Sequence, residues 1–113
     1  MKEIRWLGSS LNDLRAMPEE VRGDFGHGLC LAQGGEHPLG AKVLSGYGSG
    51  VVELIERHDG DTYRAVYTVR YRDVLYVLHC FQKKSPRGSE LPKLDRITIE
   101  SRLKDARKDA EGK

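Results

Sequence analysis

Residues 74 to 81, Val74-Leu75-Tyr76-Val77-Leu78-His79-Cys80-Phe81, form the most apolar stretch of this chain. Because apolar residues occupy both alternating faces, we expect a strand inside a sheet that helices cover on at least one side. Two more strands are predicted before it, at about 51 to 57 and 63 to 71. The connections His58-Asp59-Gly60-Asp61 and Arg72-Asp73 are short, and Asp-Gly is typical of a hairpin turn. Connections this short join antiparallel neighbours, so the three strands are predicted to form a β-meander.

Two helices are predicted between a first strand and the meander. Residues 3 to 7 are rich in strand-forming side chains. Ser10 and Asp13 resemble a capping box at the start of a short helix. A second helix should begin at Pro18, and Gly34-Gly35 should end it. This second helix contains three glycines, Gly23, Gly26 and Gly28. Because glycine has no side chain, these positions should let the helix lie close to the first helix or to the sheet.

An irregular connection and a final helix complete the predicted chain. Residues 36 to 50 are rich in glycine, with a short extended piece around Lys42-Val43-Leu44. The Gly-x-Gly-x-Gly pattern of residues 46 to 50 is not interpreted as a nucleotide-binding loop, because a strand and not a helix follows it. Pro92 should begin the final helix, and residues 105 to 113 should fray because nearly all are charged or small. The apolar stripe of this helix should pack on the sheet or on a partner, and it comprises Ile99, Leu103, Ala106 and Ala110.

These elements predict a single α+β domain over residues 1 to 113. Its order is a strand, two helices, a three-stranded antiparallel meander and a C-terminal helix, with one small sheet packed by helices. A chain of 113 residues is long enough to bury one core and too short for two.

Composition narrows the class of protein. Charged residues make up 32% of the chain and hydrophobic residues 38%, as expected for a globular, soluble domain. Cys30 and Cys80 are far apart and lack zinc-site spacing, which disfavours a disulfide scaffold and a metal centre. No segment has the length of a signal peptide or of a membrane span. We therefore expect a cytoplasmic protein without a cofactor.

A basic run directly follows the most apolar strand. It reads Phe81-Gln82-Lys83-Lys84-Ser85-Pro86-Arg87-Gly88, and the region from Lys83 to Lys104 carries an excess of four positive charges. Fixed cations on a rigid scaffold suit phosphate binding. The run is interpreted as the edge of an RNA site, and the alternative is a solvated loop that happens to be basic.

Three motifs occur in a specific order: Gly50-Val51-Val52-Glu53-Leu54, Asp59-Gly60-Asp61-Thr62-Tyr63-Arg64-Ala65-Val66-Tyr67 and His79-x-Phe81-Gln82-Lys83-Lys84-Ser85. With these motifs, roughly residues 3 to 105 resemble the phage-derived HigB-like branch of the RelE/ParE toxin superfamily. The resemblance implies the toxin of a bacterial type II toxin–antitoxin module, usually encoded with a helix-turn-helix antitoxin. Many such toxins cleave messenger RNA on the translating ribosome. The implied activity is a metal-independent endoribonuclease whose partners are the antitoxin, messenger RNA and the ribosome.

The resemblance also implies which residues would carry the reaction. Arg64 falls where the family has an arginine on the sheet, and a guanidinium there could clamp a phosphate and stabilise the transition state. The alternative is an exposed strand arginine paired with Asp59 or Asp61. Lys83 and Lys84 are the other catalytic candidates.

Strand alternation points Lys83 and Lys84 to opposite faces, so we expect only one of them to reach the site. Lys83 shares parity with Phe81. A lysine whose pKa is depressed by neighbouring Arg64 could act as a general acid or base, and a protonated one would still hold phosphate. Further RNA contacts are assigned to Arg87, Lys42, Arg57 and Lys93. For Lys42 and Arg57 the alternative is a solvent-facing charge.

Some features depart from the family pattern. Many relatives read Glu-Leu-Arg where this chain reads Glu53-Leu54-Ile55, so one expected cation is missing. No Tyr or His follows His79, and His79 itself is interpreted as a satisfied core histidine. The general acid and base therefore remain unassigned. Two alternatives stay open, a toxin that binds RNA or the ribosome without cleavage and a gyrase-targeting toxin of the same fold.

Overall fold

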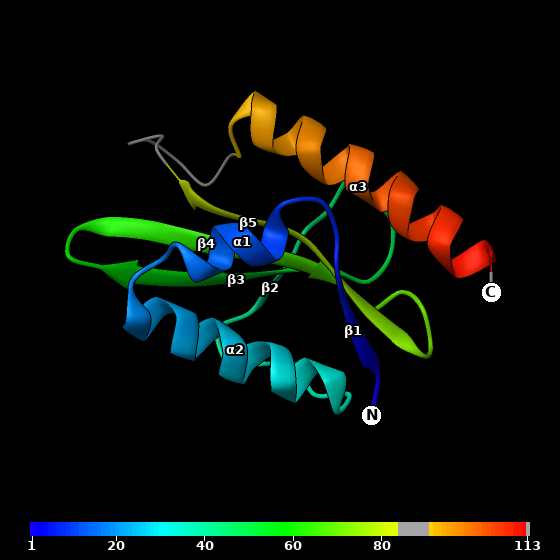
Figure 1. Cartoon of the computed structure of the whole chain (residues 1–113), viewed down its shortest axis with the longest axis horizontal. Helices are drawn as coiled ribbons and strands as arrows, with labels where there is room; N and C mark the ends of the chain where they lie inside the picture. The colour runs from blue at the N-terminus through cyan, green and yellow to red at the C-terminus, as the bar shows by residue number, and fades with distance from the viewer. Residues whose placement is uncertain (84–90, 113) are drawn as a thin grey trace.

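A five-stranded mixed sheet forms the centre of the molecule (Figure 1). The computed structural model describes residues 1–83 and 91–112. Across the sheet the strand order is β1 (Glu3–Trp6), β5 (Val74–Lys83), β4 (Asp61–Thr68), β3 (Val51–His58) and β2 (Lys42–Val43). β1 runs parallel to β5, and the other neighbours are antiparallel. The predicted α+β class, the meander and the interior position of β5 are confirmed.

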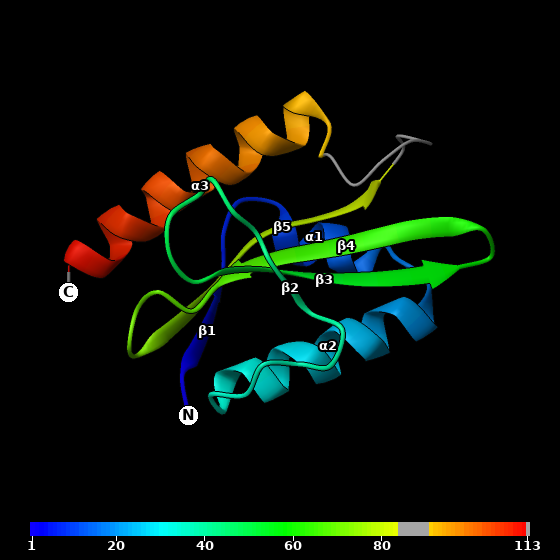
Figure 2. The same cartoon turned by 180° about the vertical axis from the view of Figure 1, so that it is seen from behind.

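Helices cover both faces of the sheet (Figures 1 and 2). α1 (Ser10–Arg15) and α2 (Glu19–Gln33) lie on one face, and α3 (Lys93–Glu111) lies on the other. Two separate apolar clusters result, one under α1 and α2 and one under α3. β5 contributes to both clusters, which is why it is apolar on both faces. Its residues alternate between the clusters from Val74 to Leu78, and beyond a register shift opposite Val66 and Tyr67 the two faces continue with Cys80 and Phe81. Among the described residues, no helix combines the length and the apolar character needed to cross a membrane.

The hairpin between β3 and β4 forms at the predicted Asp-Gly pair. Asp59 and Gly60 both have positive φ, at 49° and 82°, the combination that a type I′ turn requires. His58 pairs with Asp61, so the turn has two residues. From this turn the pairing continues along both strands until Val51 pairs with Thr68. This register fixes which side chains of the two strands share a face.

The connection between β4 and β5 is longer than predicted. β4 ends at Thr68 and not at about residue 71. The backbone N–H of Val69 donates to the Gly50 carbonyl at 2.9 Å. The Arg70 side chain donates to the carbonyls of Tyr47 at 2.7 Å and Ser49 at 2.9 Å. These contacts hold residues 69 and 70 against the loop that precedes β3, and not against β5.

The start of α1 differs by one residue from the predicted capping box. Ser9 is the N-cap residue, and its Oγ donates to Asp13 Oδ2 at 2.6 Å. Ser10 is buried, and its Oγ donates to the Val77 carbonyl at 3.4 Å. Neither serine side chain caps a backbone N–H of the helix.

Gly28 brings α2 close to the sheet. A Cβ atom at this position would lie only 2.9 Å from Leu54 Cδ1 on β3. Gly23 and Gly26 have nothing within 4 Å of the corresponding position. The expectation that glycines permit close approach to the sheet is therefore confirmed for Gly28 alone.

α3 continues to Glu111, through most of the segment that was expected to fray. Asp109 explains the added order, because it accepts hydrogen bonds from the Arg5 guanidinium and from the Tyr76 hydroxyl, the latter at 2.6 Å. Burial and this hydrogen bond raise the pKa of Tyr76 to about 12. The last turns of α3 are thereby tied to β1 and β5.

Candidate functional site

Three charged side chains gather on the side of the sheet that α3 covers: Glu53, Arg64 and Lys83, here named the charged cluster. The registers pair Arg64 with both Ile55 and Phe81, and Glu53 with Val66. Directly paired residues of antiparallel strands share a face, and Val66 and Phe81 belong to the apolar cluster under α3. Lys83 follows Phe81 by two positions on β5 and faces the same side.

The centre of the charged cluster is a buried ion pair. Arg64 Nη1 donates to Glu53 Oε1 at 2.7 Å, and the exposed side-chain fractions are 8% for Arg64 and 0% for Glu53. Pairing with Asp59 or Asp61, the alternative considered for Arg64, is not what the structure shows. Two further buried atoms of the pair, Glu53 Oε2 and Arg64 Nε, have no hydrogen-bond partner among the described residues. The guanidinium is thus held in one position, and it keeps an N–H donor that no described residue accepts.

Lys83 is the second cation of the charged cluster and is also buried, with 8% of the residue exposed. Burial lowers the pKa of Lys83, and the positive charge of Arg64 lowers it further. Glu53 partly opposes this effect, and Lys42 adds to it. The expected depression of a lysine pKa by Arg64 is confirmed in direction, although burial is the larger cause.

The predicted peripheral cations that the structure describes are exposed. Lys42 pairs with Glu53 across β2 and β3, and Arg57 lies four positions after Glu53 on β3, so both have the parity of the charged cluster. Their exposure fits the solvent-facing alternative as well as an RNA contact. Lys93 is exposed at the first residue of α3. Lys84 and Arg87 lie outside the described residues.

His79 lies further along the same face of β5. Its Nε2 is 2.8 Å from Asp95 Oδ1 on α3, and its ring stacks on Phe81 with the centroids 4.4 Å apart. Burial lowers the pKa of His79 more than Asp95 raises it. His79 is half-buried and hydrogen-bonded at Nε2, as expected of a core histidine, while Nδ1 has no partner among the described residues.

Ile55 stands directly opposite Arg64. The cation that the resemblance implies at this position would have shared a face with the Arg64 guanidinium. Here an apolar side chain takes its place, so among the described residues Arg64 and Lys83 are the cations at the centre of the site.

Glu53 is the site residue that sequence reasoning missed. The available signal was a lone carboxylate in Val51-Val52-Glu53-Leu54-Ile55, where a buried charge requires a partner. Its partner could be identified only from the strand register. Among the described residues, no group of three or more His, Cys, Asp and Glu side chains could hold a metal ion.

The arrangement suits an anion with several oxygens. Two cations outnumber one carboxylate, and the planar guanidinium can donate two parallel hydrogen bonds to a phosphate. A lysine with a lowered pKa can both hold a phosphate and transfer a proton.

Comparison with known families places the chain in a family. A search of curated proteins finds no match to the sequence. A family model described as phage-derived protein Gp49-like matches residues 12–104, most of the chain. The chain therefore belongs to the phage-derived Gp49-like family, a RelE/ParE-like family that is associated with the toxins of toxin–antitoxin systems.

Proposed function

We propose that this protein is a HigB-like toxin of a type II toxin–antitoxin module that cleaves messenger RNA on the translating ribosome without a metal ion. The observation that carries the proposal is the position of Lys83, whose lowered pKa fits proton transfer, beside Arg64 on one face of the sheet. Membership of a toxin family supports the biological setting.

The proposed reaction is a transesterification within the RNA. The 2′-hydroxyl loses its proton to a solvent water molecule, its oxygen attacks the adjacent phosphorus, and the bond to the 5′-oxygen breaks. The products are a 2′,3′-cyclic phosphate and a free 5′-hydroxyl. Negative charge develops on the non-bridging phosphate oxygens during the attack, and the leaving oxygen needs a proton.

Each member of the charged cluster has a distinct role in this reaction. Arg64 binds the non-bridging oxygens and stabilises the charge that develops on them. Lys83 donates a proton to the leaving 5′-oxygen, which its lowered pKa facilitates. Glu53 does not touch the RNA and acts as a positioning residue that holds the Arg64 guanidinium. Lys42, Arg57 and Lys93, with Lys84 and Arg87, would guide the RNA backbone.

The proposal is tested by induced expression in bacteria with mapping of RNA 5′ ends. The native chain should arrest growth and create new 5′ ends in translated messages. Lys83→Met, which keeps most of the length of the side chain and removes its ammonium group, should abolish both effects. Lys84→Met is compared with it, because only one of the two neighbouring lysines is expected to reach the site. Arg22→Ala is the matched control, since it removes an exposed cation from α2 on the opposite side of the sheet.

A second candidate function is a toxin that binds RNA or the ribosome without cleavage. The burial of Arg64 and its bond to Glu53 favour this alternative, because both limit access of a phosphate to the guanidinium. Growth arrest with intact messages would support it. Growth arrest with DNA damage and intact messages would instead support a gyrase-targeting toxin.

An antitoxin is the proposed protein partner, and a helix-turn-helix protein encoded next to this chain is the form expected. Co-expression of the two chains should restore growth, and the two should co-purify. Rescue of growth without co-purification would argue against direct inhibition by this neighbour.

A further inference from the structure

The outer edge of β3 is only partly covered. β2 pairs with β3 at Val52 and Glu53 alone, and the Leu44 N–H donates to the Val51 carbonyl at 2.9 Å. No described strand pairs with residues 54 to 58 on this side. Backbone groups of a strand alternate in direction, so Ile55 and Arg57 continue the outward-facing series of Val51 and Glu53. A sheet edge with open backbone groups is a template for another strand.

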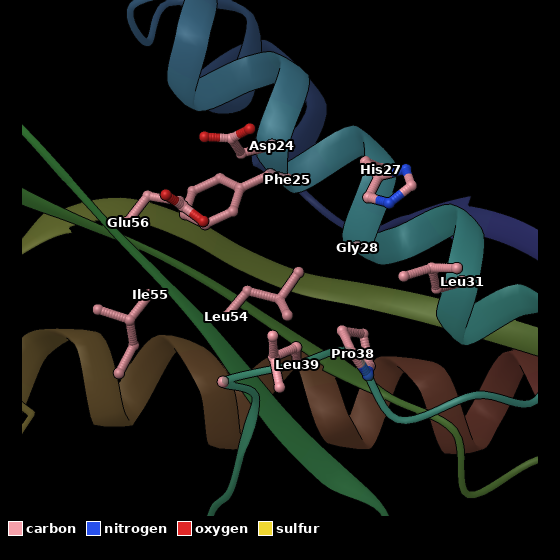
Figure 3. Close-up of a pocket in the computed structure, with 11 residues that line it drawn as sticks. Asp24, Phe25, His27, Gly28, Leu31, Pro38, Leu39, Leu54, Ile55 and Glu56 are labelled. Atoms are coloured by element: carbon pink, nitrogen blue, oxygen red, sulfur yellow. The ribbon is translucent and has the colours of Figure 1, made fainter.

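A groove of about 410 Å³ runs along this open edge, between β3, α2 and the loop that precedes β2 (Figure 3). The apolar residues on its floor include Phe25, Leu31 and Leu54. On the loop, Leu39 is fully exposed to solvent. An exposed leucine beside an apolar floor and an open strand edge marks a surface that a partner could cover.

One wall of the groove is acidic. Asp24 on α2 and Glu56 on β3 approach each other across it (Figure 3). Burial raises the pKa of Glu56, and the negative charge of Asp24 together with a hydrogen bond to it raises the pKa further. Glu20 adds a third carboxylate at the same end of α2, 3.6 Å from His58. Two neighbouring carboxylates without a described cation between them favour an incoming cation.

We propose that this groove binds an extended segment of a partner protein, which adds to β3 as a further strand. The segment places apolar side chains over Leu54 and Phe25, and it places a lysine or arginine between Asp24 and Glu56. Main-chain hydrogen bonds give such a complex its affinity, and alternate side chains give it specificity. An extended segment fits better than a helix, because the free hydrogen-bonding groups lie in a row along a strand.

This site is separate from the charged cluster. Leu54 and Glu56 have the parity of the face that α1 and α2 cover, whereas Glu53 and Arg64 face α3. The inference therefore does not rest on the proposed RNA reaction, and binding can be measured without any nuclease assay.

The test uses the purified full chain and a short synthetic peptide in which two valines and a lysine occupy alternate positions with serine between them, so that these three side chains face the same side of the added strand. Binding is followed by amide chemical shifts in NMR spectra. We expect the largest shifts at Ile55, Arg57 and the residues lining the groove. The same peptide with alternate backbone nitrogens methylated should not bind, because it cannot donate strand hydrogen bonds.

Charge recognition is tested with Asp24→Asn/Glu56→Gln. We expect this variant to bind the lysine peptide on the order of tenfold more weakly, as for the loss of a charge-assisted contact. Asp105→Asn, which removes an exposed carboxylate from α3, should bind like the native chain. Correct folding of each variant is verified from its unperturbed amide spectrum.

Three outcomes would overturn the inference. The first is equal binding of the methylated and unmethylated peptides, and the second is equal binding by the acidic-wall variant and the native chain. The third is broadening of the amide NMR signals of the β3 edge when the protein concentration rises without peptide. That result would assign the groove to a second copy of this chain.

Discussion

Arg64 donates to Glu53 at 2.7 Å from the neighbouring strand, and both side chains are buried on the face that α3 covers. The pair lies diagonally across β3 and β4, since Glu53 stands opposite Val66 and Arg64 opposite Ile55. A buried ion pair of this kind fixes the direction of the guanidinium at the cost of desolvating two charges. The relationship therefore has consequences for stability as well as for the proposed chemistry.

Removing Glu53 should destabilise the fold strongly. Glu53→Ala leaves the Arg64 charge buried without its partner, which we expect to lower the free energy of unfolding by about 3–5 kcal/mol. Glu53→Leu/Arg64→Met removes both charges and should recover much of this loss. Urea unfolding of the single and double variants measures the coupling. Strictly additive losses would show that the two side chains do not depend on each other.

His79 should make stability depend on pH. Its pKa is lowered in the folded state, chiefly by burial with a contribution from Arg102, while Asp95 and Asp13 act in the opposite direction. The unfolded chain therefore binds a proton more readily, and stability should fall as the pH drops through the ordinary value of 6.5 toward the folded pKa. Unfolding curves across this interval test the effect. His79→Gln should flatten the profile, and an unchanged slope would contradict the assignment.

Gly28 and Gly23 should respond differently to alanine. Both lie within α2, where alanine is favoured over glycine by about 1 kcal/mol. Gly23 has open space for a methyl group, so Gly23→Ala should raise the melting temperature. Gly28→Ala places its methyl 2.9 Å from Leu54 and should lose most or all of that gain. Equal stabilisation by both substitutions would mean that α2 and β3 separate readily.

Asp109 should anchor the end of α3. Asp109→Ala removes the acceptor of the Arg5 and Tyr76 hydrogen bonds, and we expect a loss of about 1–3 kcal/mol. Tyr76→Phe removes one of these bonds only and should cost less. Amide hydrogen exchange of residues 105–111 provides the local measurement, because it should accelerate in Asp109→Ala. Exchange that is already fast in the native chain would show that this segment frays.

Local signals account for the parts of the fold that were predictable. The Asp59-Gly60 turn needs positive φ at both positions, and the apolar stripe of Ile99, Leu103 and Ala106 repeats with the helical period. The end of β4 was misjudged because Arg70 bonds to the Tyr47 and Ser49 carbonyls, about twenty residues away in sequence. The order at the end of α3 likewise depends on the distant partners of Asp109.

In the candidate site too, local signals were predictable and contacts between distant residues were not. The shared face of Phe81 and Lys83 follows from strand alternation and was predicted from the sequence. The pairing of Arg64 with Glu53 was not, because it depends on the register between two strands and on which face α3 covers. Asp59 and Asp61 were closer to Arg64 in sequence, yet both lie at the exposed hairpin end.

The most direct measurement is single-turnover cleavage of ribosome-bound messenger RNA by the purified protein, comparing the native chain with Lys83→Met and Arg22→Met. We expect Lys83→Met to reduce the cleavage rate by a factor on the order of 10²–10⁴, the usual contribution of a general acid. Arg22→Met should cleave like the native chain, and the native products should carry 2′,3′-cyclic phosphate and 5′-hydroxyl ends. A Lys83→Met protein that cleaves as fast as the native chain would contradict the assignment of the charged cluster as the site of the reaction.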